Sequence, residues 1–336
     1  MIGTFSGDDA VEIGVVTRDG FAESRHLGSA VVLSADGEIQ ASYGSPETPV
    51  YPRSALKPFI AVAVLTSGVT LRGEDAAIIT SSHTGTALHV NRVRGVLERF
   101  GLDERALLCP LMLPENADAS AHVLRSGGGP LPITHGCSGK HAGLLAACVV
   151  NEWPTHSYLE HEHPLQVRIR EVIERLTGER PTAPTGDGCG TPLYALSLTG
   201  LARGMQRVAR STEQSPFALH REAGALGQAI RENPVIIRGP GEPESIAIER
   251  LGVVSKLGFE GVQTMVAPNG TAVALKTLDG SLRPGVPVAL ALLAEHGALD
   301  HAAVAETLDI VAPRFSAGNR LAGRLIPSIG AQLIRA

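Results

Sequence analysis

The hydrophobic period of this chain changes twice, which limits the folds it can adopt. Alternating apolar and polar residues predict strands in the first fifty residues, and an Asp36-Gly37 pair between two of them predicts a hairpin. From Ser54 to Gly68 the apolar residues recur at a period near 3.6, and helical patterns continue to about residue 230. Short β-type segments then return at residues 251–256, 261–267 and 271–277. We therefore expect an α/β (α+β) fold, with one antiparallel sheet built from both chain ends beside a helical region.

These patterns predict one domain over residues 1–336. Its sheet part is expected at residues 1–53 and 234–336, and its helical part at residues 54–233. Within the helical part, Ala76 to Ile79 is predicted to be a strand, and two helices at 287–295 and 302–311 are expected to close the chain. No strand-linked Gly-x-Gly-x-x-Gly and no Walker loop is present, so we expect no organic cofactor.

Charge and hydropathy argue against several kinds of partner. The net charge is −5 and the Lys and Arg residues form no basic run, so nucleic acid is not expected. The longest apolar run, Leu144 to Val150, is too short to span a bilayer, and the N-terminus lacks the pattern of a secretory signal. We expect a cytoplasmic protein without membrane contact, in which the four cysteines are free thiols or metal ligands rather than disulfides.

The first candidate for catalysis is Ser54-Ala55-Leu56-Lys57 at the start of the predicted helix. A spacing of three residues puts the lysine amine on the same helix face as the hydroxyl, where a neutral amine can accept the serine proton. An unperturbed lysine is almost entirely protonated at neutral pH, so burial or a nearby cation must lower its pKa. Since the bare pattern also occurs on solvated helices, it needs support from other motifs.

Two motifs provide that support. Lys256-Leu257-Gly258 lies on a predicted strand, and a Lys-x-Gly edge strand facing a Ser-x-x-Lys helix is typical of penicillin-recognising serine hydrolases. The polar segment Ser81 to Gly85 lies between them in sequence and offers a second hydroxyl at Ser82, although an ordinary Ser/Thr turn would look the same. The order of the three motifs favours the catalytic interpretation.

A further cluster contains cysteines. The segment Cys137 to Gly143 reads Cys-Ser-Gly-Lys-His-Ala-Gly, and a second cysteine follows in Asp187-Gly188-Cys189. No Cys-x-x-Cys pair exists, so a zinc-finger site is excluded and buried free thiols remain an alternative to a metal site.

Taken together, these motifs resemble those of the L-asparaginase II (Rhizobium-type) family, over nearly the whole chain. The string from Cys137 to Gly143 and the Asp187-Gly188-Cys189 segment are the most specific. The resemblance implies the fold of serine β-lactamases, penicillin-binding proteins and glutaminases. It also implies hydrolysis of L-asparagine to L-aspartate and ammonia by a homodimer.

The resemblance also implies roles for individual residues. Two catalytic pairs would be Ser54 with Lys57 and Ser82 with Lys256, and a zinc ion (Zn2+) would be bound by Cys137, Lys140 and Cys189. For substrate binding we expect Arg53 near the α-carboxylate, Asp187 near the α-ammonium, and His83 and His141 close by. Three of them have ordinary alternatives: Arg53 as a surface charge, Asp187 as a turn residue and His141 as a hydrogen-bonded histidine at a helix start. The chain departs from the family pattern at His135-Gly136, where an asparagine is expected, which bears on substrate preference.

Two other functions use the same motifs. A β-lactamase or penicillin-binding enzyme shares the Ser-x-x-Lys, but those enzymes work outside the cytoplasm. A non-catalytic amino-acid-binding protein on this scaffold would bind substrate without turnover, and its mark would be a missing serine or lysine. The sequence contains both serines, Ser54 and Ser82, and both lysines, Lys57 and Lys256.

Overall fold

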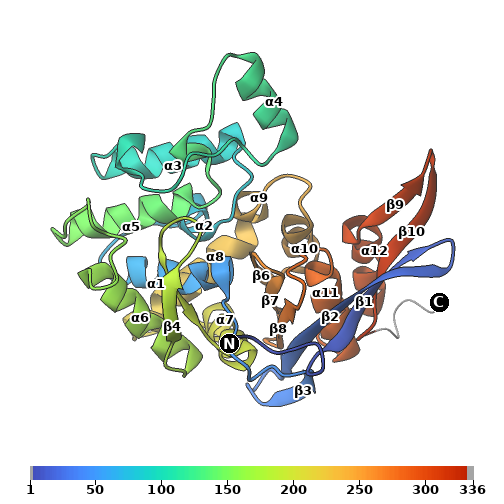
Figure 1. Ribbon diagram of the computed structural model, residues 1–336. Coiled ribbons are helices and arrows are strands. Elements are labelled where there is room, and N and C mark those ends of the chain that lie inside the picture. Colours follow the sequence, from blue (N-terminus) through green and yellow to red (C-terminus); the bar gives the residue numbers. More distant parts are fainter. Residues whose placement is uncertain (1–2, 331–336) are drawn as a thin grey trace.

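A computed structural model describes residues 3–330 of the chain (Figure 1). Its main feature, in this part of the chain, is an eight-stranded antiparallel sheet in the order β6-β7-β8-β2-β1-β10-β9, with β3 paired to β2. The strands are β1 (Val11–Arg18), β2 (Phe21–Leu33), β3 (Ile39–Tyr43), β6 (Val254–Gly258), β7 (Val262–Val266), β8 (Ala272–Thr277), β9 (Arg314–Ala317) and β10 (Arg320–Pro327). The predicted antiparallel sheet from both chain ends is confirmed.

Strand β2 joins the two ends of the chain. The first half of its 13 residues pairs with β1, and its second half pairs with β3 and with β8, where Val32 is opposite Val273. The predicted hairpin at Asp36-Gly37 is confirmed, because the Ser34 N–H donates to the Glu38 carbonyl at 2.8 Å and Gly37 has a φ of 89°. Strand β10 pairs with β1 in the register Gly14 to Pro327.

Most of the helices lie between β3 and β6. They are α1 (Lys57–Leu65), α2 (Glu74–Thr80), α3 (Ala87–Arg99), α4 (Ala117–Arg125), α5 (Ser138–Val150), α6 (Pro164–Thr177), α7 (Leu198–Arg210), α8 (Ala218–Glu232), α9 (Pro234–Ile237) and α10 (Pro243–Leu251). Two more helices, α11 (Gly285–Glu295) and α12 (His301–Val311), follow β8. Short 3-10 turns occupy η1 (Arg53–Leu56), η2 (Glu104–Ala106) and η3 (Pro132–Thr134).

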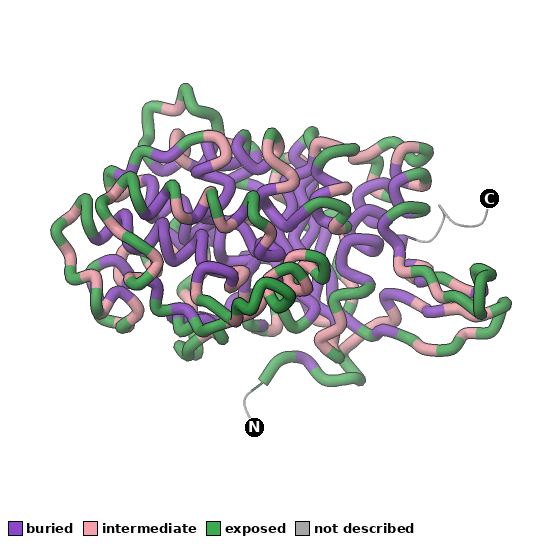
Figure 2. The backbone as a smooth tube through the Cα atoms, turned by 90° about the horizontal axis from the view of Figure 1, so that it is seen from above, coloured by how far each residue is buried: buried purple, intermediate pink, exposed green. Residues whose placement is uncertain are grey.

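The buried core continues from the sheet into the helical region (Figure 2). Every residue of β6, β7 and β8 is buried, because α7 packs on β7 and β8 and α11 also contacts these two strands. Helix α1 is buried along its whole length and contacts α2, α5 and α6. A lysine in such a helix is therefore fully removed from water.

Several sequence predictions need correction. Residues 76–79 lie in helix α2, since four apolar residues cannot distinguish a strand from a buried helix. The expected helical part also contains a two-stranded hairpin, β4 (Thr182–Gly186) with β5 (Pro192–Ala195), and the expected sheet part contains α9 and α10. The chain does not close on α12, because β9 and β10 follow it. Strand β9 is short and largely exposed, so it has little apolar alternation to detect.

No helix within residues 3–330 is long and apolar enough to cross a membrane.

Candidate active site

A cavity of about 200 Å³ lies where the start of the first long helix meets loops from the helical region. It is smaller than the roughly 300–1,000 Å³ of sites for drug-sized ligands. The residues that line it are Arg53, Ser54, Lys57, Ser82, Met112, Glu115, His135, Gly136, Cys137, Asp187, Gly188, Cys189, Arg238 and Phe259. The cavity thus brings together most of the residues that the sequence motifs singled out.

Ser54 lies on the cavity wall in the 3-10 turn η1, immediately before α1. The preceding Arg53 has a φ of 53°, a left-handed conformation that is uncommon for residues other than glycine. Within residues 3–330 the Ser54 hydroxyl makes no hydrogen bond to protein. Its oxygen is therefore free to meet a ligand in the cavity.

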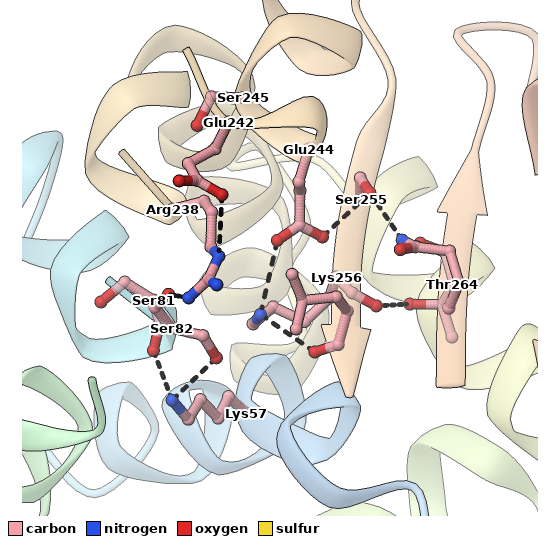
Figure 3. Close-up of polar contacts among 12 residues, drawn as sticks. Lys57, Ser81, Ser82, Arg238, Glu242, Glu244, Ser245, Ser255, Lys256 and Thr264 are labelled. Carbon is pink, nitrogen blue, oxygen red and sulfur yellow. Dashed lines mark hydrogen bonds and ion pairs between the residues drawn. The ribbon is translucent and has the colours of Figure 1, made fainter. Parts of the chain in front are cut away.

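Lys57 is one turn further along and is held by three acceptors, of which Figure 3 shows those at Ser81 and Ser82. Its ammonium donates to the Ser81 carbonyl at 2.6 Å, to Ser82 Oγ at 3.0 Å and to the Gly136 carbonyl at 3.2 Å. Burial lowers the pKa of Lys57, and the positive charge of Lys140 lowers it further, partly offset by Cys137. Lys57 thus connects with the second serine rather than with Ser54.

Lys256 is fully buried and does not line the cavity. Its Nζ donates to the Leu257 carbonyl at 3.1 Å and lies 3.6 Å from Glu244 Oε2 (Figure 3). Burial lowers the pKa of Lys256 to about 8, the Glu244 carboxylate opposes this shift, and the charge of Lys57 acts in the same direction as burial. The expected pairing of Ser82 with Lys256 is not formed within the described residues, since Ser82 Oγ is bonded to Lys57.

Glycine explains how strand β6 reaches the serine. A side chain at Gly258 would place its Cβ 2.1 Å from the Pro52 carbonyl oxygen and 3.2 Å from the Ala55 nitrogen. Only glycine allows the end of β6 to lie against η1. This edge strand of the sheet therefore brings Lys256 to the helix that bears Ser54 and Lys57, as the order of the motifs predicted.

The string from Cys137 to Gly143 forms the start of α5, and its two glycines allow close helix packing. A Cβ at Gly139 would lie 2.2 Å from the Ile78 carbonyl, and one at Gly143 would lie 2.9 Å from Ile79. Helix α5 therefore approaches α2 closely, next to the loop that carries Ser82. The string thus also has a packing role.

The β4–β5 hairpin supplies the remaining polar groups. Its turn, residues 187–191, is closed by a hydrogen bond from the Asp187 N–H to the Thr191 carbonyl at 2.9 Å. Asp187 Oδ1 accepts a hydrogen bond from Arg53 Nε at 2.7 Å, and both side chains line the cavity. The two expected substrate-binding residues therefore form an ion pair that presents both charges to one ligand.

Cys137, Lys140 and Cys189 lie together at the cavity edge. Lys140 Nζ donates to Cys189 Sγ at 2.9 Å and to Thr191 Oγ1 at 2.7 Å. A hydrogen bond with Cys137 and the charge of Lys140 hold the pKa of the Cys189 thiol well below its ordinary value. The cysteines are free, as the sequence predicted.

These three side chains fit a soft metal ion by their ligand chemistry. Thiolate sulfur suits zinc, and Cys189 already has thiolate character. Within residues 3–330, no three His, Cys, Asp or Glu side chains are placed to share a metal ion. A zinc site here would therefore need Lys140 as a ligand, in its neutral form.

The two histidines expected near substrate are buried and do not line the cavity. His83 is fully buried, with Nε2 bonded to Ser138 Oγ at 2.9 Å and Nδ1 accepting from the Gly85 N–H at 3.1 Å. His141 is buried and bonded to the Tyr158 hydroxyl at 2.7 Å, and burial lowers its pKa to about 4. Since both nitrogens of His83 are engaged, it fixes the Ser82 loop against α5 and cannot contact a ligand in this arrangement.

Sequence reasoning missed Arg238, which is buried yet reaches the cavity. Its Nη1 donates to the Ser82 carbonyl and to Glu115 Oε2, both at 2.8 Å, and its Nε lies 3.5 Å from Glu242 Oε2. The backbone of its segment also pairs with the Ser82 loop, because the Thr84 N–H donates to the Arg238 carbonyl at 2.9 Å. Arg238 belongs to none of the sequence motifs, and the residue after it, Gly239, has a φ of 156°.

The comparison with known families identifies this arrangement. The profile of the L-asparaginase II family matches residues 15–326. The chain belongs to the L-asparaginase II family. The match begins within β1 and ends within β10, so it includes all the residues of the cavity, and family membership makes this an amidohydrolase-type serine hydrolase scaffold.

Solved structures show distant likeness to this member of the L-asparaginase II family. The structure of Mglu is 13% identical, with a TM-score of 0.46 over 85% of this chain and 72% of that chain. A β-lactamase from Mycobacterium bovis is 14% identical, with a TM-score of 0.42 over 80% of this chain and 94% of that one. A Bacillus glutaminase is 12% identical, with a TM-score of 0.35 over 81% and 91%. Among curated proteins, none matches.

Proposed function

We propose that this protein hydrolyses the side-chain amide of L-asparagine to L-aspartate and ammonia. The observation that carries the proposal is the buried Lys57 amine, bonded to Ser82 Oγ at 3.0 Å and one turn from Ser54, which lines the cavity. A buried lysine with a lowered pKa, beside two hydroxyls in a small cavity, provides a base and a nucleophile for acyl transfer.

The cavity has the charges that an amino acid requires. The Arg53 guanidinium can pair with the α-carboxylate and Asp187 with the α-ammonium, since the two already lie 2.7 Å apart on one wall. When a zwitterionic amino acid binds, the Arg53–Asp187 ion pair would be replaced by two ion pairs with the ligand, one at each side chain. The side-chain amide would then extend toward Ser54, within the limits of a cavity of about 200 Å³.

The reaction would proceed in two steps. Neutral Lys57 takes the Ser54 proton as Ser54 Oγ forms a bond to the amide carbon, and the proton passes through Ser82 to the leaving nitrogen as the C–N bond breaks. Ammonia leaves and an ester with Ser54 remains. Water then attacks the ester carbonyl, gives its proton to the Lys57–Ser82 pair, and releases aspartate as Ser54 regains its proton. The charge of Lys57 acts on Lys256, and Lys256 would supply protons to Ser82 or accept them from it.

Zinc remains a proposal that rests on the resemblance and on ligand chemistry. Cys137, Lys140 and Cys189 would hold the ion, which would supply a fixed positive charge at the cavity edge. Loss of the ammonium proton from Lys140 is the main cost of binding, because the two cysteines hold the pKa of Lys140 above its ordinary value despite burial.

A homodimer and a cytoplasmic location also remain proposals from the resemblance and the sequence. Light scattering of the purified protein would determine the oligomeric state.

The deciding experiment measures ammonia release from L-asparagine and L-glutamine and ring opening of a chromogenic β-lactam by one preparation. We expect ammonia from L-asparagine at the highest rate. Ring opening without ammonia would instead assign a β-lactamase activity. Binding of L-asparagine without any turnover would assign a non-catalytic binding function.

A further inference from the structure

The Glu244 carboxylate is buried with Lys256 and has no role in the chemistry described so far. Glu244 is 1% exposed and Lys256 is fully buried, and the charged atoms lie 3.6 Å apart. Two isolated charges would be very costly at this depth, so each charge depends on the other. A buried ion pair at a catalytic cluster is therefore a candidate for controlling the reaction.

The carboxylate is held in place by the sheet. Glu244 lies in the first turn of α10, and its Oε1 accepts a hydrogen bond from Ser255 Oγ at 3.1 Å. Ser255 Oγ in turn accepts from Gln263 Nε2 at 2.9 Å, so β6 and β7 fix the orientation of the carboxylate (Figure 3). Because Ser255 precedes Lys256 on β6, the carboxylate and the lysine are positioned by the same short strand.

The contact of Glu244 with Lys256 is an ion pair rather than a hydrogen bond. At 3.6 Å the oxygen attracts the ammonium without receiving one of its protons, and Glu244 Oε2 has no hydrogen-bond partner among the described residues. Lys256 Nζ makes one hydrogen bond, to the Leu257 carbonyl, so it keeps donors for other groups. Glu244 therefore restrains the lysine electrostatically and leaves it able to exchange protons.

We propose that Glu244 is the positioning residue for Lys256, which it holds behind the Ser54–Lys57–Ser82 cluster in a charged form that can still transfer a proton. This role of Glu244 rests on the proposed function, in which Lys256 takes part in proton transfer. The charged groups that act on the pKa of Lys256 are Glu244 on α10, which lies 3.6 Å away, Lys57 on α1, Arg238 before α10 and Cys137 at the start of α5. Of these, Glu244 is the carboxylate, and it opposes the two cations.

The first test uses the pH dependence of ammonia release. The pH–rate profile of the parent protein is compared with that of Lys256→Met. The limb, meaning the change of rate with pH, that is present in the parent and absent in the variant is assigned to Lys256, whose pKa is about 8. The carboxylate favours the ammonium, so Glu244→Gln should move this limb to lower pH and reduce kcat by about tenfold or more. Glu244→Asp keeps the charge on a shorter side chain and should give an intermediate shift.

Glu242→Gln is the matched control. Glu242 lines the same small second cavity as Glu244, but its carboxylate pairs with Arg238. The limb assigned to Lys256 should stay in place in this variant, whatever its rate. A limb that does not move in Glu244→Gln, or that moves equally in Glu242→Gln, would overturn the proposal. If Glu244→Gln does not fold, Glu244→Asp provides the test. A Glu244→Asp protein with the kcat of the parent and with the Lys256 limb at the same pH would also overturn the proposal.

A second readout does not require activity. Because the pKa of Lys256 in the folded protein is below that of an unfolded lysine, the unfolded chain binds the extra proton between the two values, and stability from this group rises with pH there. Glu244→Gln should start this rise at lower pH than the parent, as followed by urea unfolding from pH 6 to 9, whereas Glu242→Gln should not. An unchanged stability profile would overturn the pairing even in a protein that releases ammonia. If no amide is hydrolysed, the proposed function fails and this measurement still tests Glu244.

Discussion

Lys57 donates a hydrogen bond to Ser82 Oγ at 3.0 Å, although the sequence placed it in a motif with Ser54. The two residues come from α1 and from the loop after α2, and the bond forms because α2 packs against both α1 and α5. Lys57 thus lies on a cavity wall that also carries the hydroxyls of Ser54 and Ser82. This arrangement determines which substitutions should abolish ammonia release.

Ser54→Ala should remove the nucleophile and reduce ammonia release by at least about 10³-fold. Ser82→Ala should leave the nucleophile in place and slow proton transfer, with a loss of about 10²-fold. Steady-state assays with L-asparagine compare the two variants. Near-normal release by Ser54→Ala together with complete loss in Ser82→Ala would exchange the two roles.

The rate should rise with pH as Lys57 loses its proton, because only the neutral amine can accept a proton from serine. Burial lowers the pKa of Lys57, so this rise should occur below the ordinary lysine pKa of 10.5. A profile of kcat/KM from pH 5 to 10 measures it. Lys57→Met should lose activity by about 10²-fold or more at every pH while remaining folded. A rise that persisted in Lys57→Met would assign the limb to another group.

Gly258→Ala should separate β6 from the start of α1, since the new Cβ would lie 2.1 Å from the Pro52 carbonyl oxygen. We expect a loss of about 1–3 kcal/mol in unfolding free energy and a marked loss of ammonia release. Gly95→Ala is the control: Gly95 lies inside α3 with open space around it, so alanine should stabilise the protein by about 0.5–1 kcal/mol. Urea unfolding and activity assays of both variants test the strand's role. Full activity in Gly258→Ala would contradict it.

Metal analysis tests the zinc proposal directly. Protein purified without chelator should contain zinc, and Cys189→Ser should contain much less. Cys148→Ser is the control, because this buried thiol lies near the other end of α5. Zinc affinity should increase with pH, because Lys140 must lose a proton to bind. A metal-free parent protein with normal ammonia release would make the site dispensable.

His135→Asn should restore the amide expected in the family at the cavity wall. His135 lines the cavity, its Nδ1 accepts from the Cys137 N–H at 3.0 Å, and burial lowers its pKa, so it is neutral at pH 7. We expect a change in KM for L-asparagine relative to L-glutamine, within about tenfold, and little change in kcat. An equal loss of kcat for both amides would instead assign His135 a role in the chemical step.

The sequence determined much of the site. The period change at Ser54 located the helix that bears Lys57, and Lys256-Leu257-Gly258 predicted an edge strand facing it. The motif strings were also sufficient to recognise the family, and two of them combine reactive side chains with glycines that close packing requires, at Gly139, Gly143 and Gly258. These are local properties: helix period, residue spacing and the conformations that glycine permits.

Only the tertiary structure decided which side chains contact the candidate site residues. Arg238 and Glu244 carry no motif, and both are held at the cluster by residues more than ten positions away, such as Glu115 and Ser255. The β4–β5 turn that delivers Asp187 and Cys189 is likewise invisible in the hydrophobic pattern, since β4 is exposed along its whole length. Whether Lys57 bonds to Ser54 or to Ser82, and whether Lys256 has a counterion, depends on the packing of α2, α5 and α10 around one cavity. Hydrophobic patterning records which face of a segment is buried, but it does not record which charged groups are then brought within a few ångströms of each other.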